Sequence, residues 1–420
     1  MIQTISLRPG VTLRCFPDSR FKHSCLTLQF VRPMRREEAS LNVLVPSILL
    51  RGTRSAPDLR AITLRLDDLY GAAIGPLARR VGDYHAFGLA SSFISDRFAM
   101  DGDQVLAPVI RFMEQLLLDP VTENGVFRKD YVAGEKKNLI TSIESQRNDK
   151  RTYTNTQMFR KMCAADSLGI PRLGEVAQVE QITPKSAWEH YNTILRESPL
   201  EIFYAGEAAP ETVAQLLMPL VDRLDRDPIT LPPQTPYQHS PEGDYTETME
   251  VSQGKLAMGF VTPVTIRDSG FAAMQVCNVL FGGGMTSLLF TNIREKMSLC
   301  YDISSGYQGS KGIVHVNAGI DADKYDTVRQ QILEQLECCK KGQFTAQQLD
   351  AAKQAVLSSL RGTHDSPGSI ESYYSSANLS GLAMTPAEYM AAVEHVAARQ
   401  VAEVAATLQL HTCYFLKGVC

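Results

Sequence analysis

The sequence has neither an apolar run long enough to cross a membrane nor a cluster of basic residues. Its densest apolar stretch, residues 41–50, is about half the length of a spanning helix. No run of five lysines or arginines occurs, and the net charge of −4 argues against nucleic acid as a partner, because phosphate binding requires a basic surface. The start of the chain lacks the charged and apolar segments of a signal peptide. We therefore expect a cytoplasmic protein without a membrane span.

The cysteines and histidines do not form the patterns that bind metals or build disulfide frameworks. The nine cysteines are an odd number and none forms a C-x-x-C pair, so reduced thiols are expected. None of the eight histidines has another three or four residues away, which is the spacing that places two imidazoles on one helix face. The sequence predicts no metal site and no other cofactor.

What the chain does have is an internal repeat. Its 420 residues, 44% of them hydrophobic, are enough for two or three globular domains. The segment LTLQFVRP at residues 26–33 aligns with LAMGFVTP at residues 256–263, and the same offset of 230 relates Gly52 to Gly282. A repeat unit of about 215 residues is a duplicated domain, since solenoid repeats span about 20–50 residues.

Each copy has the same predicted order of elements. A strand, a helix, a second strand, two helices and a closing strand follow one another. The predicted ranges are 26–31, 40–50, 85–94, 105–118, 127–143 and 202–206 in the first copy, and 256–261, 271–280, 313–320, 325–336, 346–360 and 414–418 in the second. This order favours an α+β fold of two homologous domains, each with a mainly antiparallel sheet and helices packed on one face.

A proline-rich segment separates the copies. Residues 227–244 contain five prolines, which fix φ and remove backbone donors, so the segment is predicted to be an extended linker. The predicted N-terminal domain is therefore 1–226, and the C-terminal domain is 245–420.

The second copy carries a segment that resembles a known family. LFGGGMTSLLF at residues 280–290, followed by REKMSLCY at residues 294–301, resembles the second-domain signature of the pitrilysin, or insulinase, zinc peptidases, which include the mitochondrial processing peptidase. The resemblance covers nearly the whole chain. It implies two domains that face each other as a clamshell, with a zinc site contributed by the first domain.

The residues for that zinc site are missing. Members of the family bind zinc through an inverted H-x-x-E-H helix, in which both histidines lie on one face and the glutamate acts as the base. Aligned on Gly52, these three positions fall on Val43, Pro46 and Ser47. None of the three side chains is a useful zinc ligand or a base. The degenerate motif predicts that the chain holds no zinc here.

The fourth ligand of the family is missing as well. It is the second of two glutamates seven residues apart on another helix. Glu135 fits the first of these, whereas the second position is Ser142. Glu144 is two residues further on and therefore points to a different face of the helix.

The other half of the family's active site is present. Arg294 and Tyr301 match the arginine and tyrosine that the second domain directs at the substrate, where fixed donors hold a peptide carbonyl and its oxyanion. Without the resemblance, Arg294 would read as an ordinary solvated helix end and Tyr301 as the aromatic residue of a strand. The glycines at 282–284 favour a tight turn beside a packed helix over a phosphate cradle, because no G-K-[ST] follows.

These residues imply a non-catalytic, substrate-binding or regulatory subunit of a heterodimeric zinc peptidase. Its partners would be a zinc-bearing pitrilysin-type subunit and extended peptides, which sheet edges bind as an added strand. The isolated chain would be a monomer or a homodimer without peptidase activity. Two alternatives remain: a scaffold with a peptidase-like fold and no role in proteolysis, and an enzyme with unrecognised chemistry.

Overall fold

The computed structural model describes residues 2–238 and 240–418, so one residue of the predicted linker, His239, lies outside the described residues. The chain forms two compact units, here called unit 1 and unit 2. Unit 1 comprises Met1–Glu144, Pro171–Pro233 and His364–Ser376, and unit 2 comprises Ser145–Ile170, Gln234–Thr363 and Ala377–Cys420. Each unit thus contains one segment that lies, in sequence, among residues of the other predicted domain.

Unit 1 is built on a six-stranded sheet. The strand order is β1-β2-β8-β3-β5-β4, and all neighbours are antiparallel except β2 and β8. The strands are β1 (Gln3–Arg8), β2 (Val11–Pro17), β3 (His23–Pro33), β4 (Ala73–Val81), β5 (Tyr84–Ile94) and β8 (Leu200–Gly206). A two-stranded ribbon, β6 (Thr122–Glu123) and β7 (Val126–Phe127), stands apart from this sheet.

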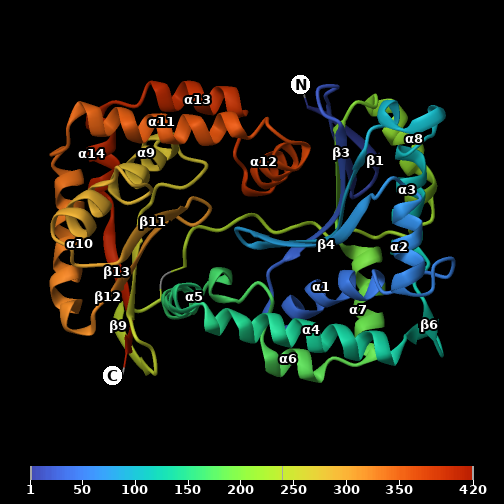
Figure 1. The fold of residues 1–420 in the computed structure, drawn as a ribbon, viewed down its shortest axis with the longest axis horizontal. Coiled ribbons are helices and arrows are strands. Elements are labelled where there is room, and N and C mark those ends of the chain that lie inside the picture. The colour runs from blue at the N-terminus through green and yellow to red at the C-terminus, as the bar shows by residue number, and fades with distance from the viewer. Residues whose placement is uncertain (1, 239, 419–420) are drawn as a thin grey trace. The chain divides into compact units, whose positions relative to one another are not determined.

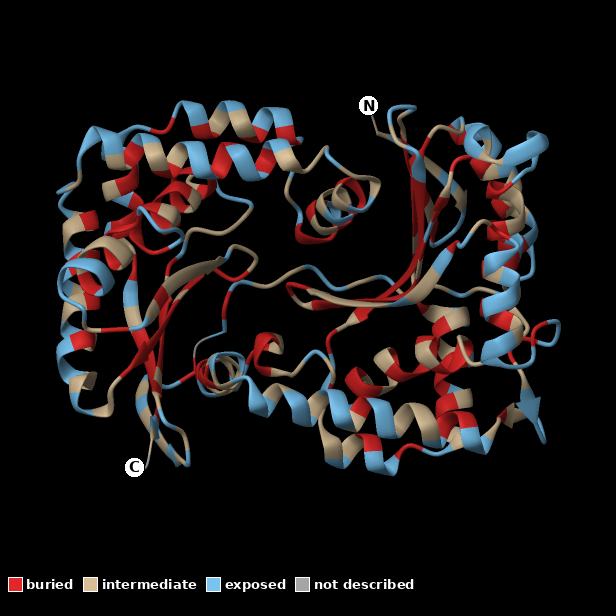
Figure 2. Ribbon diagram, viewed as in Figure 1, coloured by how far each residue is buried: buried red, intermediate tan, exposed pale blue. Residues whose placement is uncertain are grey.

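Helices cover one face of this sheet and enclose the main core (Figures 1 and 2). They are α1 (Arg36–Leu49), α2 (Leu59–Asp67), α3 (Leu106–Leu118), α4 (Lys129–Asn148), α6 (Val176–Gln181), α7 (Pro184–Glu197) and α8 (Pro210–Asp222). The alternation along β3 explains the layering, since Leu26, Leu28 and Phe30 point into this core.

Unit 2 repeats the plan with five strands. The order is β11-β12-β10-β13-β9, with only β13 and β9 parallel. The strands are β9 (Gly243–Met249), β10 (Gly254–Val261), β11 (Asp302–Gln308), β12 (Ile313–Ile320) and β13 (Gln409–Gly418). The helices are α9 (Phe271–Phe281), α10 (Tyr325–Lys340), α11 (Ala346–Gly362), α13 (Pro386–Glu394) and α14 (Ala398–Ala406). The predicted fold class, α+β with mainly antiparallel sheets, is confirmed, and most helices of each unit pack on one face of its sheet.

A single helix lies against the opposite face of each sheet, and it comes from the other half of the sequence. Helix α5 (Lys150–Met162) directly follows α4 but packs on β10 and β13 of unit 2. On β10, Ala257 contacts this helix, and a Cβ at Gly259 would collide with Met162 and come within 2.9 Å of Met158. The glycine therefore makes room for two methionines. This exchange was not predicted from the sequence.

Helix α12 (Pro367–Ser380) makes the reciprocal contact, and residues 367–376 belong to unit 1. Its Glu371 is 3% exposed and forms two hydrogen bonds with Arg79 of β4, at 3.2 and 2.9 Å. The Gln29 amide donates to the same carboxylate at 2.7 Å. Gln29 and Gly259 are equivalent positions of the repeat, so a polar contact in unit 1 replaces the methionine contact of unit 2.

The segment that carries α5 is fixed in unit 2 by a second buried carboxylate. Asp166 accepts from Lys311 at 3.1 Å, and both side chains are essentially inaccessible, at 1% and 0% exposed. Asp166 also accepts from the backbone N–H of Leu168, and the Lys311 amine donates to the Thr235 carbonyl at 3.1 Å. This cluster joins the exchanged segment, the linker and the β11–β12 turn.

Two expectations from composition, on membrane helices and on the cysteines, can be compared with the described residues. Among them, no helix combines the length and apolar character that a membrane crossing needs. The eight cysteines in the described part of the chain are free, and all except Cys338 are buried.

We predict that Lys311→Met lowers the free energy of unfolding by about 3–5 kcal/mol, because it leaves the Asp166 carboxylate buried without a counter-charge. Adding Asp166→Asn removes that charge and should restore much of the loss. Urea denaturation followed by circular dichroism measures both variants. Lys185→Met, at a side chain that is 79% exposed and paired with Glu189, is the control and should change stability by less than about 0.5 kcal/mol. If Lys311→Met lowered the free energy of unfolding no more than Lys185→Met does, the buried pair would not be needed for stability.

Candidate functional site

The three degenerate metal positions on α1 lie in one turn of that helix. Pro46 is buried, and Val43 and Ser47 are half-buried. The Ser47 hydroxyl donates to the Val43 carbonyl at 3.3 Å, so its proton serves the backbone of its own helix. Valine and proline side chains have no donor atom for a metal.

The degenerate position on α4 does not complete a metal site either. Ser142 is exposed, and its hydroxyl donates to the Asn138 carbonyl at 2.9 Å. Glu135, which survives from the family pattern, is paired with Arg51 at 3.3 Å and accepts from the Asn138 amide at 3.2 Å. A guanidinium thus supplies the positive charge beside this glutamate. The side chains present at these positions do not fit zinc, and the described residues contain no cluster of three or more metal-binding side chains.

A buried polar chain lies on the core side of α1. Asn42 is fully buried; its amide nitrogen lies 3.3 Å from His85 Nδ1, and its oxygen lies 2.8 Å from His190 Nε2. Burial lowers the pKa of His85 to about 3, helped by Arg80 and Arg172, and burial lowers the pKa of His190 to about 4 against the opposing field of Glu38. Both imidazoles are therefore neutral at physiological pH. This chain of side chains was not predicted from the sequence.

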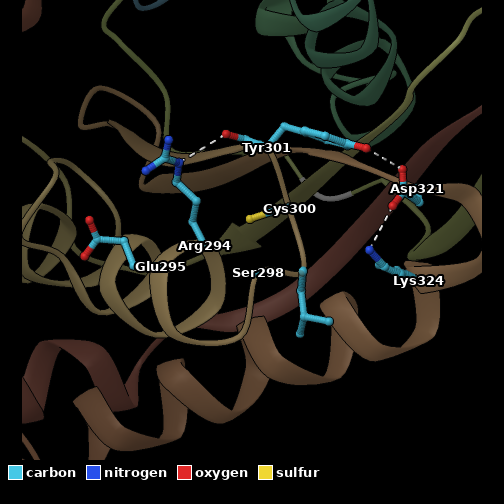
Figure 3. A pocket seen from close by; sticks show the side chains of 8 residues that line it. Arg294, Glu295, Ser298, Cys300, Tyr301, Asp321 and Lys324 are labelled. Atoms are coloured by element: carbon cyan, nitrogen blue, oxygen red, sulfur yellow. Dashed lines mark hydrogen bonds and ion pairs between the residues drawn. The ribbon is translucent and has the colours of Figure 1, made fainter.

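The structure brings Arg294 and Tyr301 together in one pocket of unit 2, with a volume of about 480 Å³ (Figure 3). Arg294 belongs to a π-helical segment, η4 (Leu289–Lys296), and Tyr301 directly precedes β11. The turn before η4 needs its first glycine, because a Cβ at Gly282 would come within 2.7 Å of Leu289 and 2.8 Å of Ser305. This contact supports the packing interpretation of the glycines.

Arg294 is oriented by two contacts. Its Nε donates to the Tyr301 carbonyl at 3.2 Å, and its guanidinium carbon lies 4.7 Å from the centre of the Phe290 ring. Neither terminal amino group has a hydrogen-bond partner among the described residues. Both terminal amino groups, with four N–H donors between them, are therefore available for a ligand.

Two further residues of the pocket were not predicted. The Tyr301 hydroxyl donates to Asp321 Oδ1 at 3.0 Å, and the Lys324 amine contacts Asp321 Oδ2 at 2.8 Å. Lys324, and then Tyr301, lower the pKa of the Asp321 carboxyl, while the hydrogen bond to Asp321 raises the pKa of Tyr301. Asp321 follows the end of β12 and Lys324 ends a 3₁₀ turn, η5 (Ala322–Lys324). Their sequence, Asp-Ala-Asp-Lys, reads only as a solvated turn.

The two predicted donors point away from each other. Figure 3 shows the Arg294 guanidinium on one side of the Tyr301 main chain and the Tyr301 ring extending to Asp321 on the other. The tyrosine side chain is 61% exposed. In this arrangement the two groups do not meet at one point.

Of the four edge strands in the two large sheets, β4 and β11 are less open to an added strand than expected. On edge strand β4, Pro76 has no N–H, and Arg172 donates to the Ala78 carbonyl at 3.0 Å. On edge strand β11, the Ser305 N–H donates to the Gly282 carbonyl at 2.8 Å. An extended peptide would find an interrupted ladder on both strands.

Comparisons with known proteins agree with the fold. Residues 181–356 match the family model described as the peptidase M16 inactive domain. The "probable inactive metalloprotease YmfF" of Bacillus subtilis is 26% identical over 97% of this chain and 96% of its own. An "uncharacterized zinc protease YmxG" of the same organism is 28% identical, but over 27% of this chain and 28% of its own.

A solved structure of a conserved protein from Enterococcus faecalis has a TM-score of 0.92 and 27% identity, and covers 100% of this chain and 99% of its own. The fold of this chain is therefore shared with that protein over its whole length. The chain is thus similar to the M16, or pitrilysin-type, peptidases, and these matches support a non-catalytic, peptidase-like protein.

We predict that restoring the four metal-site residues does not give tight zinc binding. Val43→His, Pro46→Glu, Ser47→His and Ser142→Glu supply the ligands and the base but leave the Arg51 guanidinium paired with Glu135 on the same helix as the new glutamate. Elemental analysis should find well below one zinc per chain. The matched variant adds Arg51→Leu and should bind more zinc. Stoichiometric zinc in the four-residue variant would contradict the role given to Arg51.

We predict that acid destabilises the protein between about pH 6.5 and pH 4. The unfolded state binds protons at His85 and His190 in this range and the folded state does not, so the free energy of unfolding falls as pH falls. His190→Gln retains a hydrogen-bonding side chain and removes one titrating group. Urea denaturation at several pH values should give a slope smaller by up to about 1.4 kcal/mol per pH unit. An unchanged slope in His190→Gln would contradict this prediction.

Proposed function

We propose that this chain is the substrate-binding subunit of a heterodimeric zinc peptidase. A second, pitrilysin-type subunit with an intact H-x-x-E-H helix supplies the metal and the base. This chain supplies Arg294 as a donor to a peptide carbonyl at the composite active site. The observation that carries the proposal is the asymmetry of the two half-sites: the ligand positions at 43, 47 and 142 are lost, while Arg294 keeps two unengaged terminal amino groups in a pocket.

The distribution of relatives supports the existence of such a partner. In Bacillus subtilis, one relative is named a probable inactive metalloprotease and another is named an uncharacterized zinc protease. One genome therefore encodes both types of chain. The proposal requires an equivalent pair in the organism of this chain.

The mode of peptide binding follows from the pocket and from the edges. The interrupted ladders of β4 and β11 give little support to a full added strand on these two edges. We propose that the peptide is held mainly by the side chains of the pocket, with its main chain extended. The same interruption is the specific observation in favour of the second candidate function, a scaffold with no role in proteolysis.

We predict that the isolated chain does not cleave peptides and that the mixed pair does. In the pair, Arg294→Ala should lower kcat/KM about a hundredfold, the typical effect of losing one oxyanion donor, without changing complex formation. Lys296→Ala is the matched control, because this cation lies two residues away and does not line the pocket. Peptide cleavage and size-exclusion chromatography measure the two properties. Full activity of the Arg294→Ala pair would support the scaffold instead.

A further inference from the structure

Among the described residues, the side chain of Tyr301 makes one hydrogen bond, although its main chain is fixed. The Tyr301 N–H donates to the Gly319 carbonyl at 2.9 Å, and its own carbonyl accepts from Arg294. The ring is largely exposed, and the one hydrogen bond of the hydroxyl goes to Asp321. The position of the hydroxyl therefore depends on Asp321.

This hydrogen bond decides what Tyr301 offers to a ligand. A phenol has one proton, and here that proton is donated to a carboxylate. Towards any third group the oxygen presents lone pairs only. Donation to a peptide carbonyl, or to the oxyanion that forms from it, requires the hydrogen bond to Asp321 to break.

Asp321 is itself fixed as a charged acceptor. Lys324 occupies its other oxygen at 2.8 Å, and both residues come from the short segment after β12. Breaking the tyrosine contact would leave one carboxylate oxygen to water, which is a small loss for an exposed group. The contact is thus strong enough to hold the phenol and weak enough to yield to a ligand.

We propose that Asp321 is a positioning residue that competes with the substrate carbonyl for the proton of Tyr301. With Asp321 engaged, Arg294 alone donates to the ligand; with Tyr301 released, the ring turns and both residues donate. The inference rests on the proposed function, because the competing ligand is a peptide carbonyl. It adds a switch between a one-donor and a two-donor pocket.

The first test uses the free chain and no peptide. Tyrosine labelled with ¹³C at Cζ gives one NMR signal per ring, and Tyr301→Phe identifies the signal of Tyr301. We expect the pKa of Tyr301 to lie above its ordinary value in the original chain and to fall towards that value in Asp321→Ala. Asp323→Ala is the matched control, since it removes a neighbouring exposed charge that makes no contact with the phenol. An unchanged titration in Asp321→Ala would overturn the proposal.

The second test measures competition with blocked trialanine amide as the carbonyl probe. Asp321→Ala should strengthen its binding about two- to tenfold, the range expected for releasing one hydrogen bond. In the Tyr301→Phe background the same substitution should have no effect. An equal gain in both backgrounds, or no response to the probe in Asp321→Ala, would overturn the proposal.

The two tests separate this inference from the proposed function. Failure of the heterodimer appears as an inactive mixed pair, while the titration of Tyr301 in the free chain does not depend on any partner. In an active pair, Asp321→Ala should lower KM and leave kcat nearly unchanged if the contact weakens only substrate binding. A fall in kcat with KM unchanged would show that Asp321 acts in the reaction itself and not as a competitor.

Discussion

Two buried carboxylates hold the exchanged segments, and the rest of the molecule depends on them. Asp166 pairs with Lys311 in unit 2, and Glu371 pairs with Arg79 in unit 1. A buried ion pair adds little net stability relative to an apolar contact, but breaking one partner is costly. Such a pair therefore selects one arrangement over others. Here it selects the arrangement in which each sheet receives a helix from the distant half of the chain.

The exchanged helix α5 contacts β11, the strand that follows Tyr301 of the candidate site. Arg151 of the exchanged helix α5 donates to Ser304, three residues after Tyr301. The same helix packs against β12 through Phe159 and His315, and β12 ends just before Asp321. The strands that present Tyr301 and Asp321 are thus supported on one face by a segment from the first half of the sequence. Burial lowers the pKa of His315 to about 4, so this imidazole is neutral at physiological pH.

Local sequence pattern was enough for the elements that belong to one copy. The strand at 313–320 and the helices beginning at 271, 325 and 346 start where the apolar spacing placed them, because each has its own apolar stripe. Helix α1 begins four residues before its predicted start, at Arg36. Helices α5 and α12 were missed, because the strands against which they pack lie far away in the sequence. Gly259 was a hint, since a glycine inside a strand suggests close approach of another element.

The candidate site was predictable only in part for a similar reason. Arg294 and Tyr301 were found through the motif of residues 280–301. The degenerate positions were found because the H-x-x-E-H motif is absent at residues 43–47. Asp321 and Lys324 reach the pocket only because β11 pairs with β12 in a register that brings Asp302 opposite Gly319. Such a register cannot be predicted from the sequence of either strand alone. The same holds for Asn42, whose two histidine partners come from β5 and α7.

The exchange also has a consequence for how such a chain arises. A single ancestral copy would have left one face of its sheet bare, and two identical copies would have covered both faces by trading helices. The present chain is equivalent to that traded dimer joined into one polypeptide. Once joined, the copies no longer had to match. The equivalent residues Gln29 and Gly259 differ in this way, because Gln29 contacts a glutamate and Gly259 contacts two methionines.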